Sequence, residues 1–290
     1  MKTGKYGYIN KKGTFVINPQ FDESFDFSEG LAKIRIGNEE RGTPDGEYKR
    51  ALDNSAGKCG FINKTGKTVI EPKYNEARDF HEGLAAVRIG DYLTGKWGFI
   101  DKIGNVVADI KYDKVEDFSE GLAVVRIGEK CGYIDKKGNI VIKPEYLDAK
   151  SFKEGLAPVC IKNSEKSTYG YIDKKGKVII PPQFDYADEF SEGLKMAKKY
   201  GYINKEGKIV INLQFTDAGN FSEGLAKVSL EEGAEKRFGF INKEGKIVIN
   251  PQFYVLLGFK GGLAEVAEDS FKIYGYIDKT GKYVWKDSEE

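Results

Sequence analysis

The sequence predicts an all-β protein made of short antiparallel strands in tandem repeat. Three observations carry this prediction. The chain has 35 glycines but only 8 prolines among 290 residues, a balance unlike that of collagen or of a proline-rich linker. A motif of glycine, an aromatic residue and isoleucine recurs eight times. No segment shows the spacing of apolar residues that predicts an amphipathic helix.

The repeated glycines stand at fixed distances from two other motifs. In seven copies an aromatic residue follows the first glycine by 14 positions, and a Gly-Leu pair follows that aromatic residue by 9 positions, as in Gly98, Tyr112 and Gly121. Two constant spacings in seven copies indicate a repeat architecture. The first glycines of the eight copies are Gly7, Gly60, Gly98, Gly132, Gly170, Gly201, Gly239 and Gly275.

Each unit is expected to hold three short strands, which are illustrated here at the start of the chain. Residues 31–36 follow the Gly-Leu glycine and alternate with period two, as a strand does. Residues 6–9 form the aromatic-Gly strand, and the glycine of the turn 10–13 suits a hairpin connection with positive φ. Residues 14–17 form the third strand, which ends near a proline. A crossing segment, 21–27, then leads into the next unit.

All length variation falls between the Gly-Leu strand and the next aromatic-Gly strand. Such a segment is expected to be a surface loop, and binding residues are concentrated in loops of this kind. The longest insert spans 38–57, and shorter variable loops lie near 161–168, 229–237 and 267–273. The candidate specificity residues in these loops are Glu39, Arg41, Asp45, Tyr48, Arg50, Lys162, Glu231 and Glu232.

We expect one repeat domain over residues 1–290, with about 7.5 repeats. The hairpins are expected to start near residues 5, 58, 96, 130, 168, 199, 237 and 273. A closed β-propeller usually has an incomplete unit at one end that the other end completes. Here the last hairpin, 276–285, is surplus, which favours an open β-solenoid or superhelix over a closed propeller.

The two motifs together resemble those of a known family. The run Trp97-Gly-Phe-Ile-Asp-Lys102 and the run Phe118-Ser-Glu-Gly-Leu-Ala123, with their equivalents, are similar to the bacterial WG-repeat family. Only Trp97 carries the tryptophan of the family name. The resemblance implies a bacterial all-β repeat module and no established reaction. The other seven copies have Tyr6, Cys59, Cys131, Tyr169, Tyr200, Phe238 and Tyr274 at that place.

The composition excludes several function classes. Lysine and arginine number 46 against 45 acidic residues, which argues against a nucleic-acid-binding protein. One histidine and three cysteines leave little for a metal site or for general-base catalysis, and no phosphate-binding glycine motif is present. We therefore predict no catalytic residue, no metal and no cofactor. No apolar run is long enough to predict membrane insertion.

The compartment is inferred from the cysteines and from the start of the chain. An odd number of cysteines and no signal-like opening segment favour the cytoplasm. The alternative is the mature part of an exported protein.

Lysine occupies the second position of every hairpin tip, while the segments before the Gly-Leu pairs are acidic. The first interpretation is that these lysines pair with neighbouring glutamates in contacts that set the register. Glutamates such as Glu29 and Glu82, which precede the Gly-Leu glycine, recur too often to be catalytic and are expected to be structural. The alternative is an unpaired edge that binds an anionic partner. The candidate residues of that edge are Lys11, Lys64, Lys102, Lys136, Lys174, Lys205, Lys243 and Lys279.

The aromatic residues also allow two interpretations. A row of rings at Trp97, Tyr169 and Tyr200 could bind a sugar or an organic cation. We favour a place in the core, because Cys59 and Cys131 fill the same position and a thiol is a poor stacking platform.

The sequence therefore predicts a non-enzymatic repeat scaffold that binds a protein or peptide through its variable loops. The alternative is a carbohydrate-binding or cell-envelope-binding module that uses exposed aromatic residues or the lysine-rich hairpin edge. Repeat arrays offer long binding surfaces while their framework residues are occupied in packing.

Overall fold

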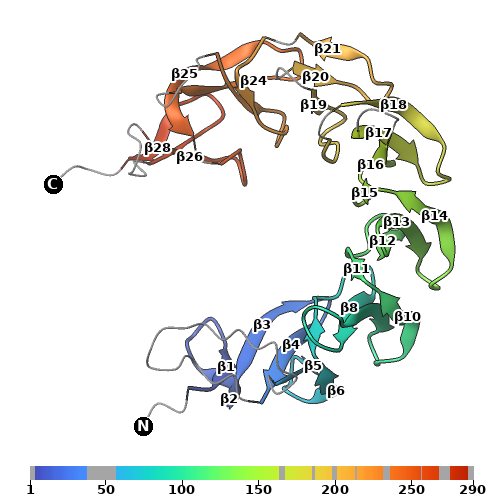
Figure 1. Ribbon diagram of the computed structural model, residues 1–290. Coiled ribbons are helices and arrows are strands. Elements are labelled where there is room, and N and C mark those ends of the chain that lie inside the picture. Colours follow the sequence, from blue (N-terminus) through green and yellow to red (C-terminus); the bar gives the residue numbers. More distant parts are fainter. Residues whose placement is uncertain are drawn as a thin grey trace, which may run out of the picture. The chain divides into compact units, whose positions relative to one another are not determined.

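The computed structural model describes residues 4–37, 57–162, 167–184, 187–197, 201–212, 214–230, 236–255, 257–267 and 275–286. All regular structure in these residues is β-strand, and every strand pair is antiparallel, which confirms the all-β prediction (Figure 1). None of them forms a helix that could cross a membrane. The chain divides into two compact units, Met1–Ser151 and Phe152–Glu290, which are described separately.

The first unit contains four successive sheets, called here the first to the fourth sheet. Their strand orders are β1-β2, β3-β4-β5-β6, β7-β8-β9-β10 and β11-β12-β13-β14. The bounds are β1 (Tyr6–Ile9), β2 (Phe15–Phe21), β3 (Glu23–Ser28), β4 (Leu31–Ile36), β5 (Lys58–Asn63), β6 (Thr68–Tyr74), β7 (Glu76–Ala77), β8 (Leu84–Ile89), β9 (Lys96–Asp101), β10 (Val106–Tyr112), β11 (Lys114–Val115), β12 (Leu122–Ile127), β13 (Lys130–Asp135), β14 (Ile140–Tyr146) and β15 (Asp148–Ala149).

The second unit repeats the same strand sequence. Strands β16-β17-β18 and β19-β20-β21 pair in these orders, and β22 to β28 pair consecutively. The bounds are β16 (Leu156–Lys162), β17 (Ser167–Asp173), β18 (Val178–Phe184), β19 (Lys195–Ala197), β20 (Gly201–Ile203), β21 (Ile209–Ile211), β22 (Asp217–Ala218), β23 (Ala226–Ser229), β24 (Phe238–Ile241), β25 (Ile247–Val255), β26 (Ala264–Ala267), β27 (Gly275–Ile277) and β28 (Tyr283–Lys286).

The complete sheets of the first unit have four strands, so the prediction of three-stranded units was wrong. The additional strand is the beginning of the crossing segment, as in β7, where Glu76 pairs with Arg88 and Ala77 with Val87. A single residue, Asn75, separates β7 from β6. The edge strand of one sheet thus continues directly as the opposite edge strand of the next sheet. In β25 the two strands are merged, which joins seven strands into one sheet.

The first glycine of each repeat is required by a close approach of the neighbouring strand. A Cβ added to Gly98 would lie 2.6 Å from the carbonyl oxygen of Ala108 and 2.8 Å from Cα of Ile110. The pairing of β9 with β10 shifts register at this point, as at a β-bulge. Any larger residue would force the two strands apart.

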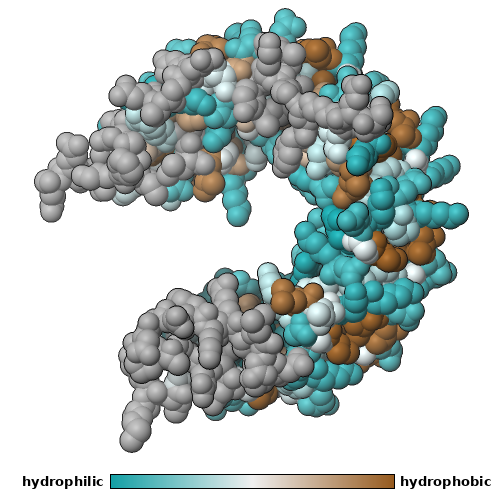
Figure 2. Space-filling model, in the orientation of Figure 1, coloured by the Kyte–Doolittle hydropathy of each residue, from teal (hydrophilic) through white to brown (hydrophobic). Residues whose placement is uncertain are grey.

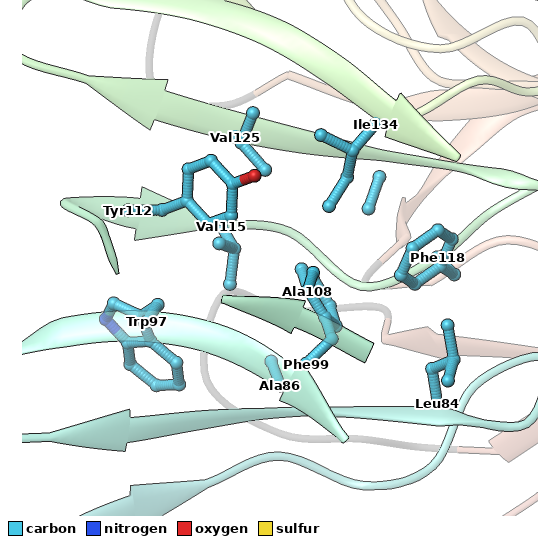
Figure 3. Close-up of a cluster of buried hydrophobic side chains, with 11 residues drawn as sticks. Leu84, Ala86, Trp97, Phe99, Ala108, Tyr112, Val115, Phe118, Val125 and Ile134 are labelled. Carbon is cyan, nitrogen blue, oxygen red and sulfur yellow. The ribbon is translucent and has the colours of Figure 1, made fainter. Parts of the chain in front are cut away.

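The core lies between successive sheets. In Figure 3, Phe99 of the third sheet and Phe118, which comes just before β12 of the fourth sheet, are part of one buried cluster. Their ring centroids are 4.8 Å apart with an interplanar angle of 69°. Such an edge-to-face pair contributes about 0.5–1.5 kcal/mol beyond its buried area. The phenylalanine of the Phe-Ser-Glu-Gly motif therefore packs one sheet against the previous one.

Apolar side chains also remain on the surface. Val106, Ile140 and Val141, on the outer strands β10 and β14, are exposed. Figure 2 shows hydrophobic patches alternating with hydrophilic side chains on the face in view.

Candidate functional site

The glutamate of the Phe-Ser-Glu-Gly motif lies in a two-residue hairpin turn. In the third sheet His81 and Leu84 exchange backbone hydrogen bonds, with N···O distances of 2.9 and 3.1 Å. Glu82 and Gly83 between them have φ values of 53° and 90°. Two positive φ values define a type I′ turn, in which asparagine or glycine is the usual residue. Glutamate in this conformation costs about 1 kcal/mol, and it recurs at Glu29, Glu82, Glu120, Glu154, Glu192 and Glu223.

Contacts with the next sheet offset this cost. Oε2 of Glu82 accepts a hydrogen bond from the backbone N–H of Gly121 at 3.0 Å and lies 3.0 Å from Nζ of Lys136. Gly121 and Lys136 belong to the fourth sheet. We use the name inter-sheet glutamates for those that make both contacts within one of the two units. They are Glu29 with Gly83 and Lys102, Glu82 with Gly121 and Lys136, Glu154 with Gly193 and Lys205, Glu192 with Gly224 and Lys243, and Glu223 with Gly262 and Lys279.

The two contacts favour the ionised form of the Glu82 carboxylate. Partial burial raises the pKa of Glu82, but the hydrogen bonds from Lys136 and Gly121 outweigh it and hold the pKa below its ordinary value. The same balance lowers the pKa of Glu29 and of Glu154. The charged form is therefore the one that joins the sheets.

The opposite end of the third sheet carries an ordered loop. Ile89 pairs with Lys96 and Leu84 with Asp101, so the loop 90–95 and the hairpin tip 102–105 lie at opposite ends of β8 and β9. Oδ1 of Asp91 accepts hydrogen bonds from the backbone N–H groups of Leu93 at 2.8 Å and Thr94 at 2.7 Å, and Oδ2 accepts one from the Thr94 hydroxyl at 2.6 Å. The hydrogen bond from Thr94 holds the pKa of Asp91 below its ordinary value.

The loop presents two apolar side chains to solvent. Tyr92 and Leu93 are each 74% exposed. Below them the guanidinium carbon of Arg88 lies 5.6 Å from the centroid of the Tyr92 ring, and its Nη1 donates to the carbonyl oxygen of Asp91 at 2.7 Å. A second Arg88 nitrogen, Nη2, lies 2.7 Å from the Glu76 carboxylate. Asp91 and Arg88 thus fix the loop from its two sides.

The repeat is matched by a known family. The family model described as "WG containing repeat" matches residues 6–39, 60–92, 97–131, 132–164, 169–199, 200–232 and 238–270. The chain belongs to this family. Most WG repeats begin at the aromatic-Gly hairpin of one sheet and end beyond the Gly-Leu strand of the next, so most sequence repeats link two sheets covalently.

Several solved structures resemble the WG-repeat chain, among them the following two. One is described as "The beta-propeller domain of the Trilobed protease from Pyrococcus furiosus reveals an open velcro topology"; the TM-score is 0.44, the identity 11%, and the match covers 91% of this chain and 99% of that one. The other is a crystal structure of the tricorn protease, with a TM-score of 0.32 and 12% identity over 83% of this chain and 27% of that one. A comparison with curated proteins gave no match.

Tip lysines of the WG repeats pair with the inter-sheet glutamates, as the first of the two interpretations of the sequence has it; they are Lys102, Lys136, Lys205, Lys243 and Lys279. Lys174 occupies the same tip position. Lys11 and Lys64 are exposed and form no ion pair with any residue that the structure describes. A role of the whole lysine edge toward an anionic partner stays a prediction.

The aromatic candidates that the structure describes are buried or half-buried. Trp97 is only 9% exposed and lies in a core cluster, with the guanidinium carbons of Arg78 and Arg88 5.0 and 5.7 Å from its ring centroid. Tyr169 is half-buried, and Tyr200 lies outside the described residues. Burial of Trp97 agrees with the place in the core that the cysteines at equivalent positions indicated.

Most of the candidate specificity residues lie outside the described residues. Lys162 is exposed at the end of β16. Sequence reasoning missed Tyr92 and Leu93, although an Asp-x-x-Thr turn between two glycines was a signal for an ordered loop. The candidates outside the described residues are Glu39, Arg41, Asp45, Tyr48, Arg50, Glu231 and Glu232.

The described residues hold little reactive chemistry. Nε2 of His81 lies 3.7 Å from the Asp117 carboxylate at an exposed position. Cys59 and Cys131 are buried, and burial raises the pKa of both thiols. Within the described ranges no group of three or more histidine, cysteine and acidic side chains is placed to hold a metal ion.

Proposed function

We propose that this WG-repeat chain is a non-enzymatic scaffold that binds a protein or peptide at the loop end of its sheets. The observation that carries the proposal is the ordered loop 90–95, which holds Tyr92 and Leu93 in solvent. Tyrosine is a frequent interface anchor, because it offers a large contact area with few rotatable bonds.

The order of the loop supports binding rather than packing. Neither Tyr92 nor Leu93 gains from burial within the chain, since both are mostly exposed. A loop whose backbone is already held in place by hydrogen bonds loses less entropy when a partner covers it. Burial of about 100 Å² of apolar surface per side chain contributes about 2.5 kcal/mol each before the costs of association.

The non-enzymatic part of the proposal rests on how the repeated polar residues are used. The inter-sheet glutamates and their lysines are engaged in joining sheets. Residues engaged in this way hold the framework, and recognition is left to the variable loops.

We also propose an open array of sheets. The first sheet has two strands, while the C-terminal part of the last sheet already pairs four strands, β25 to β28, in the order of a complete repeat sheet. The last sheet therefore needs no strand from the first one to be complete. Small-angle X-ray scattering with an end-to-end dimension larger than that of a ring would support the open array, and the profile of a compact ring would contradict it.

The binding proposal is tested with the double variant Tyr92→Ser/Leu93→Ser. A partner is first captured by cross-linking with the wild-type chain, then purified, and its affinity is measured by calorimetry. We expect the double variant to bind at least about 10-fold more weakly, which corresponds to about 1.4 kcal/mol. Deletion of residues 40–55 tests the longest insert in the same assay.

The matched control is Ile140→Ser/Val141→Ser, which removes two exposed apolar side chains from the outer strand β14. This control should bind as the wild type does. Equal affinity of the wild type and the Tyr92→Ser/Leu93→Ser variant, with an unchanged circular dichroism spectrum, would contradict the loop as a binding site. Loss of affinity in the control alone would place the site on the outer strands instead.

A further inference from the structure

The edge of the first sheet differs from every equivalent edge in the first unit. Among the described residues β1 pairs only with β2. In the second, third and fourth sheets the equivalent strands β5, β9 and β13 each pair on their other side with a Gly-Leu strand over six residues. No strand among the described residues pairs with the outer edge of β1, the edge that a Gly-Leu strand covers in the second, third and fourth sheets.

Side chains of β1 are exposed at positions where, in the third sheet, a Gly-Leu strand covers the equivalent residues. Tyr6 is 50% exposed, whereas Trp97 at the same repeat position is buried, with Arg88 of the Gly-Leu strand over its ring. Ile9 is 59% exposed, while its equivalent Ile100 is completely buried and pairs with Ala85. The first sheet thus exposes surface that a Gly-Leu strand helps to bury in the third.

A second feature lies on the neighbouring sheet. In the third sheet, Gly83 and Lys102 both contact a glutamate of the preceding sheet, and Gly121 and Lys136 do so in the fourth. The residues at the equivalent positions of the second sheet are Gly30 and Lys64. No carboxylate contacts Gly30 N–H or Lys64 Nζ among the described residues. The hairpin tip of Lys64 lies against the first sheet, since a Cβ on Gly66 would be 3.1 Å from Cγ2 of Ile17.

One segment would engage both features. In this chain the glutamate that contacts the next sheet comes immediately before the Gly-Leu strand, as Glu29 precedes β4 and Glu82 precedes β8. A strand added to β1 in the same register would place such a glutamate on Gly30 and Lys64. A single strand with a glutamate before it would therefore pair with the edge of β1 and also contact Lys64.

We infer that the edge of β1, with Gly30 and Lys64, binds an extended segment of another polypeptide that carries Glu-Gly followed by alternating small and aliphatic residues. The register of β8 on β9 defines the ligand. A leucine would lie opposite Asn10, an alanine opposite Ile9 and an arginine opposite Tyr6. Main-chain hydrogen bonds supply the affinity of such strand addition, and the glutamate and the small residues supply its specificity.

The inference goes beyond the proposed function, because this site lies on the β1 edge and at the hairpin tip 63–66. The loop 90–95 lies at the opposite end of its own sheet from the hairpin tip. Loss of binding at the loop would leave the β1 site intact, and the reverse also holds. The two experiments therefore fail independently.

The probe is a fluorescent peptide with the sequence of residues 118–128, which contains Glu120, Gly121 and the strand β12. Fluorescence anisotropy measures its binding to the full chain. We expect saturable binding, a loss of at least about 10-fold with Lys64→Glu, and recovery when Lys64→Glu meets a peptide that carries Glu120→Lys. Hydrogen exchange at residues 6–9 should slow when the peptide is bound.

Two controls separate strand addition from simple charge attraction. Lys11→Glu changes another exposed tip lysine, one that the glutamate of an added strand would not reach, so the affinity should change less than about 2-fold. A peptide with N-methyl groups on alternate backbone nitrogens keeps its charge but cannot pair with β1, and it should not bind. Absence of saturable binding, or binding that survives both Lys64→Glu and N-methylation, would overturn the inference.

Discussion

An inter-sheet glutamate makes two opposing contributions to the stability of the fold: its contacts with the next sheet stabilise it, and its positive φ destabilises it. Two replacements of Glu82 separate them. Glu82→Ala removes the hydrogen bond from Gly121 and the ion pair with Lys136 but keeps a side chain at a φ of 53°. Glu82→Gly removes the same contacts and also relieves the backbone. Gly261 occupies the equivalent place in the last repeat with a φ of 63°, which shows that glycine fits the turn.

The magnitudes follow from the geometry. The hydrogen bond that the Glu82 carboxylate accepts from Gly121 N–H is 3.0 Å long and partly exposed, and it contributes about 1 kcal/mol. The ion pair adds only about 0.5 kcal/mol, because the Glu82 and Lys136 side chains are 31% and 46% exposed and solvent screens them. We therefore expect Glu82→Ala to lower the free energy of unfolding by about 1.5 kcal/mol. Glu82→Gly recovers about 1 kcal/mol of backbone strain, which leaves a loss of about 0.5 kcal/mol.

The assay is urea unfolding followed by the fluorescence of Trp97, which is buried in the same sheet as Glu82. A Trp285→Phe background removes the second tryptophan, which is exposed. Equal destabilisation by Glu82→Ala and Glu82→Gly would refute the strained turn. Wild-type stability of Glu82→Ala would refute the inter-sheet contact.

Three further predictions concern the framework. Gly98→Ala should lower the free energy of unfolding in urea by about 3 kcal/mol or more, because its Cβ would lie 2.6 Å from a backbone oxygen. In Gly121→Ala the Cβ meets no atom within 4 Å, so the loss should be only the about 1–2 kcal/mol that a φ of 88° costs. Because the pKa of Glu82 is lower in the folded chain than in the unfolded one, its ionised form stabilises the fold fully at a pH above the unfolded pKa. The urea midpoint should therefore fall as the pH drops through the pKa of Glu82 in the folded chain, and it should fall less steeply in Glu82→Gln. Identical pH profiles of the wild type and the variant would contradict this. The buried Cys131 thiol, whose pKa burial raises, should react with a disulfide reagent about 100-fold more slowly than in urea, and fast reaction of the native chain would be inconsistent with its place in the core.

The repeat spacing was enough to predict the strands and hairpins. The sequence from Lys96 to Ile127 contains a hairpin turn with strand patterns on both sides and a period-two pattern after the Gly-Leu glycine, and the structure places β9, β10 and β12 in this stretch. The short strand β11 has only two residues, Lys114 and Val115, which is too short for any alternation to show. Its position depends on pairing with Arg126 and Val125, which the local sequence does not encode.

The inter-sheet glutamates could be located but not understood from the sequence. Local preference argues against glutamate at positive φ, so Glu82 gave no sign of a type I′ turn. The partner of Glu82 is Lys136, 54 residues further along the chain, and only the stacking of sheets brings them together. The sequence did supply both charges, and their pairing was one of two open interpretations. Tertiary contact here outweighs a local conformational preference.

The central claim is that each inter-sheet glutamate accepts a hydrogen bond from a glycine N–H of the next sheet. Site-resolved hydrogen exchange by NMR at Gly30, Gly83 and Gly121 tests this claim most directly. We predict slow exchange at Gly83 and Gly121 and faster exchange at Gly30, whose N–H has no acceptor among the described residues. Glu29→Ala should accelerate exchange at Gly83 while Gly121 keeps its rate. Equal exchange at the three glycines in the wild type, or an unchanged rate at Gly83 in Glu29→Ala, would contradict the claim.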